Sequence, residues 1–381
     1  MDVFVDDVKV ATCRAELYRA DLEQAGKGDG CCAFEIHLPA APRHGAQLRV
    51  VFAGTTIELP GGPIVVDAGA AVGHDDVPPL AGSPQYRSRF GGLWPDLANA
   101  LEIVADKKAR EALSDEEASL LRHWIADGYI VLPSAIDPVL IDALEEEVEA
   151  IWDGASRHAC FVEYWENDVK TVQPAGPKFR SVPVKLLDLY AHLENARRIM
   201  FAPAILRFLT LVFEQPAVAF QGLYFRWGSR QDIHQDTAFV KVSSPMRLVA
   251  SWVALEDIQP GSGELEYYVG SHTLEDYLFD GRHKWMPFRS TEYSAYVASL
   301  HARSQARGLE RQRFQPKKGD VLIWSADLAH GGSQDISRAV TRKSLVTHYC
   351  PADCQPVYSG DGIAPIRHSF NASAFYTVPP N

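Results

Sequence analysis

The sequence of 381 residues lacks any apolar run that approaches the length needed to cross a bilayer, and it is poor in positive charge. Its net charge of -12, without a stripe rich in Lys or Arg, argues against general attraction to nucleic-acid phosphates. Residues 1–10 are too acidic and too interrupted by Asp for a signal peptide. We therefore expect a soluble, cytoplasmic protein with no nucleic-acid partner and no membrane span.

Cysteine is scarce as well. The six cysteines lie at positions 13, 31, 32, 160, 350 and 354, and no Cys-x-x-Cys pair occurs. This pattern argues against a zinc knuckle or a dithiol redox motif and favours free thiols. The alternative is that Cys350 and Cys354 hold a metal with a second pair, but no partner pair at ligand spacing is evident.

The length predicts two domains, and a hydrophobic content of 46 % is ample for a buried core. Residues 1–78 predict a small β-rich, sandwich-like accessory domain. Its short apolar runs, at 34–38, 47–52 and 56–59, are separated by Gly and Pro. Residues 79–112 predict a linker and a helix, and residues 113–381 a second, larger domain.

The larger domain begins with helical signals. Ser114 and Glu117 form a capping box, and Asp137 with Pro138 supplies an N-cap and a first-turn proline. Residues 129–133 between them predict a strand, and residues 186–213 predict a further helical stretch.

The sequence pattern then changes from helical to strand-like, with runs rich in Val, Leu, Tyr, Trp and Phe. These runs cover residues 217–227, 247–255, 264–269, 321–324 and 343–349. Helices followed by many short strands predict a mainly β (α+β) protein: an antiparallel jelly roll buttressed by helices.

One constellation in this region has the composition of a metal site. His234 and Asp236 are separated by one residue, and His330 follows 94 positions after Asp236. Two histidines and one carboxylate are the ligands of a mononuclear non-haem Fe(II) site with open coordination positions. On an extended strand, residues two apart project from the same face, so this pair can hold one ion. The third ligand, His330, lies where the strand 321–324 has passed into the turn-like segment 329–332.

Two similar matches fit less well. His74 and Asp76 fall in a Gly-, Ala- and Pro-rich segment in which no strand is expected. His192 and Glu194 fall in the predicted helix 186–213, where residues two apart point about 200° from each other. We therefore expect neither pair to bind a metal.

A basic residue follows the distal histidine. Arg342 opens an alternating run whose even-numbered members, Arg342, Ser344, Val346 and His348, share one face. A guanidinium there can pair bidentately with a carboxylate inside the barrel. The alternative is that Arg342 is a surface charge at the end of a strand.

Five ordered landmarks carry a family resemblance. They are "LSDEEASLLRHWIADGYIVLPSAID" at 113–137, "HQD" at 234–236, "GSGELEYYVGSH" at 261–272, "GDVLIWSADLAHGGSQ" at 319–334 and "RKSLVTHY" at 342–349. Residues 113–349 thus resemble the phytanoyl-CoA dioxygenase family of Fe(II)/2-oxoglutarate-dependent oxygenases. The resemblance implies a double-stranded β-helix (a cupin-like jelly roll), with His234, Asp236 and His330 as iron ligands and an arginine that pairs with 2-oxoglutarate.

The anchoring arginine departs from the family pattern. Members usually place it eleven residues after the distal histidine, whereas Arg342 is twelve away, and position 341 is Thr. A one-residue insertion in 331–341 restores the alignment, and Arg338 is the competing candidate. The resemblance also assigns Lys185 and Gln221 to the 2-oxoglutarate pocket, although a structural role explains either equally well.

The resemblance implies an enzyme that uses Fe(II), 2-oxoglutarate and O2 to hydroxylate or otherwise oxidise a C–H bond of a small molecule. Residues 19–39 are similar to a β-rich domain of bacterial surface-polysaccharide proteins, which suggests a sugar or glycan precursor as substrate. Two alternatives stay open: a non-catalytic carbohydrate-binding jelly roll, and a cupin-type metalloenzyme that does not use 2-oxoglutarate. The sequence predicts no oligomeric state.

Overall fold

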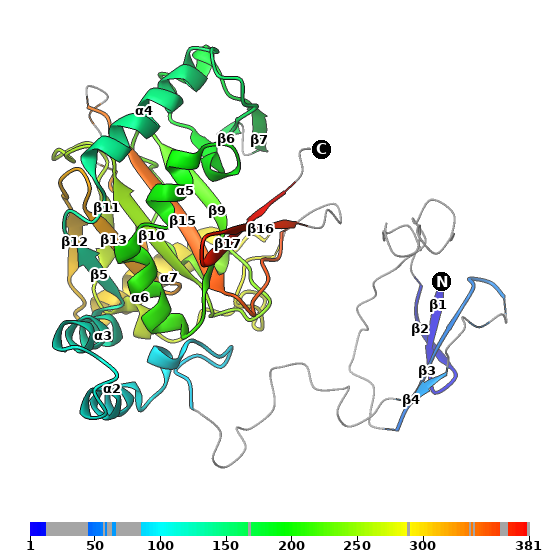
Figure 1. Ribbon diagram of the computed structural model, residues 1–381. Helices are drawn as coiled ribbons and strands as arrows, with labels where there is room; N and C mark the ends of the chain where they lie inside the picture. The colour runs from blue at the N-terminus through cyan, green and yellow to red at the C-terminus, as the bar shows by residue number, and fades with distance from the viewer. Residues whose placement is uncertain are drawn as a thin grey trace. The chain divides into compact units, whose positions relative to one another are not determined.

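The computed structural model describes residues 1–12, 45–55, 58, 63–65, 85–166, 169–287, 290–334, 337, 340–358 and 365–378 (Figure 1). The chain forms two compact units. Unit 1 comprises residues 1–83 and 359–364, and unit 2 comprises residues 84–358 and 365–381.

The described residues of unit 1 form one small antiparallel sheet. Its strand order is β2-β1-β3-β4, with β1 at Asp2–Val5, β2 at Val8–Thr12, β3 at Gln47–Val51 and β4 at Ile64–Val65. Strand β3 matches the predicted run 47–52. The run 34–38, most of 56–59 and the segment 19–39 lie outside the described residues.

The described part of unit 2 contains six α-helices: α2 Ala100–Ala109, α3 Asp115–Asp127, α4 Pro138–Trp152, α5 Glu194–Met200, α6 Pro203–Phe213 and α7 Tyr293–Ala306. The predicted caps are confirmed. The Ser114 side chain accepts a hydrogen bond from Glu117 N, and Asp137 accepts one from Val139 N. These bonds satisfy backbone donors that a helix start otherwise leaves unpaired.

A large, almost entirely antiparallel sheet is the centre of unit 2. Its order is β5-β13-β10-β15-β9-β8-β6-β7, and the hairpin β16–β17 joins it through a parallel pairing of β17 with β9. The bounds are β5 Tyr129–Leu132, β6 Phe161–Glu166, β7 Val169–Pro174, β8 Lys185–Leu187, β9 Ala217–Phe225, β10 Val249–Ala254, β13 Val321–Ser325, β15 Ser344–Pro351, β16 Ile366–Phe370 and β17 Ser373–Thr377.

A second, three-stranded sheet has the order β12-β11-β14, with β12 at Arg311–Phe314, β11 at Leu265–Tyr268 and β14 at His330–Gly332. Strand β13 shows how the layers meet. Val321 and Ile323 belong to the core shared with the helices, whereas Leu322 and Trp324 pack with residues of the small sheet. Helices, large sheet and small sheet therefore form three layers, and the two sheets are the predicted jelly roll.

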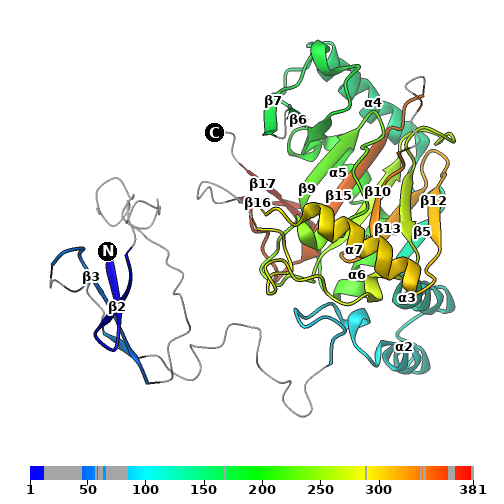
Figure 2. The same cartoon turned by 180° about the vertical axis from the view of Figure 1, so that it is seen from behind.

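Helix α7 lies across one face of unit 2 (Figure 2), and the short 3-10 helix η5 (Ser271–Thr273) contacts the segment before His330, where Ala329 N donates to Ser271 Oγ. Tyr296 and Leu300 of α7 pack in one cluster with Ile233, Ala238 and Ala329, which are neighbours in sequence of the predicted triad. Helix α7 thus covers the segments of the predicted triad, on the side opposite to the helices that pack against the large sheet.

Three local predictions were wrong. Residues 186–213 are not one helix: Leu186 pairs with β9 as part of β8, a 3-10 helix follows at Leu189–Ala191, and Pro203 starts α6 separately from α5. Residues 330–332 form strand β14 rather than a turn. Asp236 does not lie on a strand but begins a 3-10 helix, η4, at Asp236–Ala238.

Two further expectations can be checked within the described residues. Cys160, Cys350 and Cys354 are free and buried, as expected, while the other three cysteines lie outside the described residues. No helix in the described part of the chain is both long and apolar enough to cross a membrane.

Candidate metal centre

A cavity of about 60 Å³ lies between the two sheets of unit 2. Phe225 of β9 and Trp252 of β10 line it from the large sheet, and Leu265 of β11 lines it from the small sheet. The polar residues on its wall are Ser229, Gln231, His234, Asp236, His330, Arg342 and His348. The predicted metal ligands and the predicted anchoring arginine therefore share one cavity.

Backbone pairing holds the two histidines of the predicted triad side by side. His234 N donates to His330 O at 2.8 Å, and His330 N donates to His234 O at 2.9 Å. Strand β14 in turn pairs with β11, which fixes His330 opposite Tyr267. Gln235 has an extended backbone, so Asp236 projects to the same side as His234, as predicted, although neither lies on a long strand.

The ligand atoms of the three residues converge. His234 Nε2 lies 3.9 Å from Asp236 Oδ1, and His330 Nε2 lies 3.7 Å from the same oxygen. All three atoms fall within 4.8 Å of one another. Nδ1 of His234 lies 2.8 Å from Asp232 O, and Nδ1 of His330 lies 2.9 Å from Leu328 O. Since a carbonyl only accepts, each Nδ1 carries the proton, and each Nε2 presents a lone pair towards the common centre.

The second oxygen of Asp236 is already bonded. Trp324 Nε1 donates to Asp236 Oδ2 at 2.8 Å, and His348 Nε2 lies 3.3 Å from it. Oδ1 is consequently the oxygen that faces the two imidazoles. The carboxylate is oriented to give one ligand atom, which leaves other coordination positions open.

Burial and charge set the protonation states that a metal requires. Burial lowers the pKa of His234 to about 3, and the charge of His330 acts in the same direction. Burial opposes ionisation of Asp236, but the neighbouring His330 and His348 hold the pKa of that carboxyl below its usual range. Neutral imidazole and ionised carboxylate are the metal-binding forms of these groups.

Arg342 is a buried cation without a counterion in the described residues. Its side chain is 2 % exposed, and its guanidinium carbon lies 5.4 Å from the Phe225 ring centroid and 5.5 Å from that of Trp252. No described residue forms an ion pair with it, and its Nε has no hydrogen-bond partner. Burial lowers the pKa of Arg342 to about 10, although Glu264 and Glu256 act in the opposite direction.

Two further polar atoms near Arg342 lack partners. Trp252 Nε1 and Ser344 Oγ are buried and form no hydrogen bond with any described residue. Leaving a buried donor unpaired costs about 1–3 kcal/mol, and an unpaired buried charge costs more. The surroundings of Arg342 therefore fit an anionic ligand that enters the cavity. The competing Arg338 lies outside the described residues.

Lys185 and Gln221, the other two residues predicted for the 2-oxoglutarate pocket, are not among the described residues that line the cavity. Lys185 lies opposite Phe225 in the pairing of β8 with β9, so it shares the cavity side of the sheet, but its Nζ lies 3.4 Å from Glu163 Oε1. Gln221 lies opposite His348 in the pairing of β9 with β15. Their assignment to the 2-oxoglutarate pocket stays a prediction.

Sequence reasoning did not assign a role to Trp324 or His348, yet both contact Asp236. A signal for His348 existed, because the alternation of residues 342–349 places it on the face of Arg342. No such signal pointed to Trp324, whose position depends on the pairing of β13 with β10 and β5.

In the described residues, His234, Asp236 and His330 are the only group of three or more candidate ligands that cluster. His192 and Glu194 do not share one helix, which corrects the prediction: His192 is the C-cap of a 3-10 helix, and Glu194 begins α5. His74 and Asp76 lie outside the described residues.

Comparison with known proteins now adds to the geometry. The profile of the phytanoyl-CoA dioxygenase family matches residues 124–344, which is more than half of the chain. The chain belongs to this family. Members of the phytanoyl-CoA dioxygenase family are oxidoreductases, and with the His-Asp-His group this assigns iron as the metal and 2-oxoglutarate as the co-substrate.

Individual relatives are distant. Dioxygenase olcK of Penicillium canescens is 24 % identical over 246 residues, which cover 61 % of this chain and 70 % of the relative. Among solved structures, the non-heme alpha ketoglutarate dependent epimerase SnoN from nogalamycin biosynthesis is similar with a TM-score of 0.48 and 17 % identity, over 65 % of this chain and 87 % of that one. EctD from S. alaskensis gives a TM-score of 0.44 and 18 % identity, over 63 % and 77 %.

Proposed function

We propose that this family member is an Fe(II)- and 2-oxoglutarate-dependent dioxygenase that hydroxylates a C–H bond of a small organic molecule. One observation carries the proposal: a convergent His-Asp-His group lines the same cavity as a buried arginine that has no counterion among the described residues. A cupin-type metalloenzyme that does not use 2-oxoglutarate has no need of such an arginine, and family membership argues against a non-catalytic protein.

The triad would hold the metal through three atoms: Nε2 of His234, Nε2 of His330 and Oδ1 of Asp236. The Nδ1–H groups of both histidines stay bonded to backbone carbonyls, and Trp324 keeps Oδ2 of the carboxylate turned away. Iron bound in this way supplies oxygen activation coupled to decarboxylation of 2-oxoglutarate, so that substrate, 2-oxoglutarate and O2 give hydroxylated product, succinate and CO2.

Arg342 would bind the carboxylate of 2-oxoglutarate that lies farther from the metal. Its position between the rings of Phe225 and Trp252 restricts the guanidinium and excludes water, which strengthens a charge-assisted hydrogen bond. Ser344 Oγ and Trp252 Nε1 are the neighbouring buried atoms without partners. The chain's own contribution is therefore placement of the co-substrate and exclusion of water.

The substrate is proposed only as a small molecule. A sugar or glycan precursor was suggested by residues 19–39, which lie outside the described residues, and it stays a prediction.

The proposal is tested by following succinate. Purified protein is given Fe(II), ascorbate, O2 and 2-oxoglutarate, with and without pools of nucleotide sugars, acyl-CoAs and amino acids. We expect slow succinate formation without substrate, its loss in His234→Ala, and stimulation by one pool. Failure of the anaerobic Fe(II) protein to bind 2-oxoglutarate, seen as no new visible absorption, would contradict the proposal.

The anchor is tested by a matched pair of arginine variants. Arg342→Ala removes the buried cation, so we expect the KM for 2-oxoglutarate to rise on the order of 100-fold, with little change in metal affinity. Arg338→Ala is the control and should leave the KM within about twofold of wild type. The opposite result would transfer the role to Arg338.

A further inference from the structure

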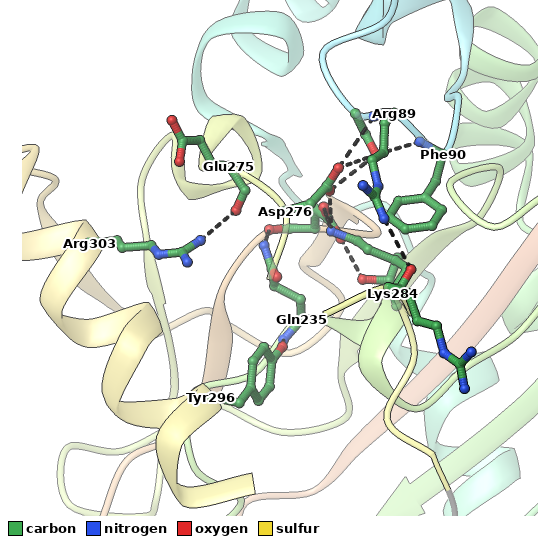
Figure 3. Close-up of polar contacts among 12 residues, drawn as sticks. Arg89, Phe90, Gln235, Glu275, Asp276, Lys284, Tyr296 and Arg303 are labelled. Atoms are coloured by element: carbon green, nitrogen blue, oxygen red, sulfur yellow. Dashed lines mark hydrogen bonds and ion pairs between the residues drawn. The ribbon is translucent and has the colours of Figure 1, made fainter. Parts of the chain in front are cut away.

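A lysine is buried beside the metal centre but outside its cavity. Lys284 is 2 % exposed and lies in the segment between η5 and α7. Its Nζ lies 2.7 Å from Asp276 Oδ1 and 2.5 Å from Asp327 Oδ2 (Figure 3). None of these three residues is among those that line the cavity.

Asp327 links this lysine to both ligand segments. It precedes His330 by three residues, and its Oδ1 accepts a hydrogen bond from Thr237 Oγ1 at 2.5 Å. Its backbone oxygen accepts a second bond, from Gln235 Nε2, at 2.8 Å. Gln235 and Thr237 are the residues on either side of Asp236. One buried aspartate thus joins the segment of the proximal ligands to the segment of the distal one.

Further hydrogen bonds restrain both ends of this network. Gln235 N donates to the hydroxyl of Tyr296 on α7 at 2.7 Å, and Figure 3 shows these two side chains next to the lysine network. Asp276, at the other end of the network, accepts hydrogen bonds from Ser88 Oγ at 2.9 Å and from Arg89 N at 3.3 Å. The carboxylates are therefore held on both sides, and Lys284 is their common cation.

Stability alone is a weak explanation for this network. Desolvating an ammonium and two carboxylates is costly, and apolar residues of similar volume often give equal or greater stability. Directional bonds do something that apolar packing cannot: they fix Thr237, and with it the start of the 3-10 helix from which Asp236 projects. Polar partners bonded directly to metal ligands orient them, and their loss typically lowers metal affinity 10- to 100-fold. Here the bonds act one residue away from Asp236, on Gln235 and Thr237.

We propose that Lys284 and Asp327 are positioning residues that set the metal affinity by holding the Gln235–Thr237 segment against the segment of His330. The proposal rests on the proposed function, since it requires that the triad binds a metal. It predicts an effect on the apoprotein's affinity for metal, separate from any effect on substrate or 2-oxoglutarate.

The test measures Co(II) binding to the metal-free full chain, by equilibrium dialysis and by the visible spectrum of the bound ion. Thr237→Val keeps the side-chain shape but removes the hydroxyl bonded to Asp327, and we expect about tenfold weaker binding. Thr237→Ser keeps the hydroxyl and should stay within about twofold of wild type. Lys284→Met should weaken binding by about 10- to 100-fold.

A control variant comes from the same segment. Arg303 Nη1 donates to Glu275 O (Figure 3) and so also ties this segment to α7, and within the described residues no hydrogen bond or ion pair joins it to either ligand segment. Arg303→Met should bind Co(II) like wild type. Thermal unfolding of each apoprotein establishes that the variants are folded, and if Lys284→Met does not fold, the Thr237 pair decides alone.

The two hypotheses fail in different ways. If wild type binds Co(II) no better than His234→Ala, the proposed function is wrong. If wild type binds Co(II) and folded Thr237→Val binds it equally well, the triad is a metal site but the network does not position it. Weaker binding in Thr237→Val, restored in Thr237→Ser, supports the proposal.

Discussion

The two oxygens of Asp236 have different partners, and this division shapes the candidate site. Oδ2 accepts from the indole of Trp324 and lies near His348, while Oδ1 faces the two histidines. Without these partners the carboxylate is free to rotate and to chelate a metal with both oxygens. An oxygenase needs vacant positions for its co-substrates, so a carboxylate restricted to one ligand atom suits the chemistry.

A single substitution tests the role of the indole. Trp324→Phe keeps most of the packing but removes the donor to Asp236, so we expect Co(II) affinity of the apoprotein to fall about tenfold. Trp152→Phe is the matched control, because that indole is also buried but lies in the core shared with the helices, where its Nε1 bonds to none of the described residues. Equal affinities in the two variants would show that the indole does not orient the ligand.

Sequence reasoning went further for some site residues than for others. The one-residue spacing of His234 and Asp236 and the alternation after Arg342 are local patterns, and within each pattern local geometry turns the side chains to the same side, towards the cavity. The contact of Trp324 with Asp236 joins residues 88 positions apart and depends on which strands pair. The ion pair of Lys284 with Asp327 could not be predicted either, because no local sequence pattern places these two residues together.

At the scale of elements, the same distinction holds. The capping box at Ser114 and the N-cap at Asp137 were predicted, since a cap depends on neighbours three residues apart or fewer. The hairpin of β6 and β7 was not predicted, and Leu186 was assigned to a helix although it pairs with Val162 and Tyr224. Apolar residues in short runs suit a helix or a strand, and only the partner strand decides.

Two glycines that follow helices allow a controlled test of how closely the end of α3 packs against its surroundings. Gly128 caps α3 with φ 82°, and Gly308 follows α7 with φ 64°. A Cβ at Gly308 meets nothing within 4 Å, whereas a Cβ at Gly128 overlaps the ring of His272. We expect Gly308→Ala to lower the free energy of unfolding by about 1 kcal/mol and Gly128→Ala by about 3 kcal/mol, measured by urea denaturation. Equal losses would mean that the His272 ring moves aside at no cost.

At the scale of the whole molecule, stability is predicted to depend on pH through His272, which is not one of the predicted metal ligands. Burial, followed by the charge of Arg87, lowers the pKa of His272 to about 3. As the pH falls below 6.5, the unfolded chain takes up a proton at this histidine and the folded chain does not, so stability present above pH 6.5 is lost.

We expect protonation of His272 in the unfolded chain to lower the free energy of unfolding by about 2 kcal/mol between pH 6.5 and pH 4.5. Urea denaturation of wild type and His272→Asn at both values is the measurement. The variant should start less stable, because it loses buried packing, but should lose about 2 kcal/mol less on acidification. A wild type and a variant with the same pH dependence would contradict the assignment of a buried neutral imidazole.

The division of the chain leads to the last prediction. Unit 2 contains the triad, Arg342 and the Lys284 network, and its helices and two sheets share continuous cores. We therefore expect a chain of residues 84–381 to fold, to bind Co(II) with wild-type affinity and to form succinate from 2-oxoglutarate at a rate within about twofold of the full chain.

If the shortened chain folds but loses Co(II) affinity, residues 1–83 contribute to the metal site itself. If it keeps Co(II) binding and uncoupled turnover but is no longer stimulated by the substrate pool that activates the full chain, residues 1–83 act in substrate recognition.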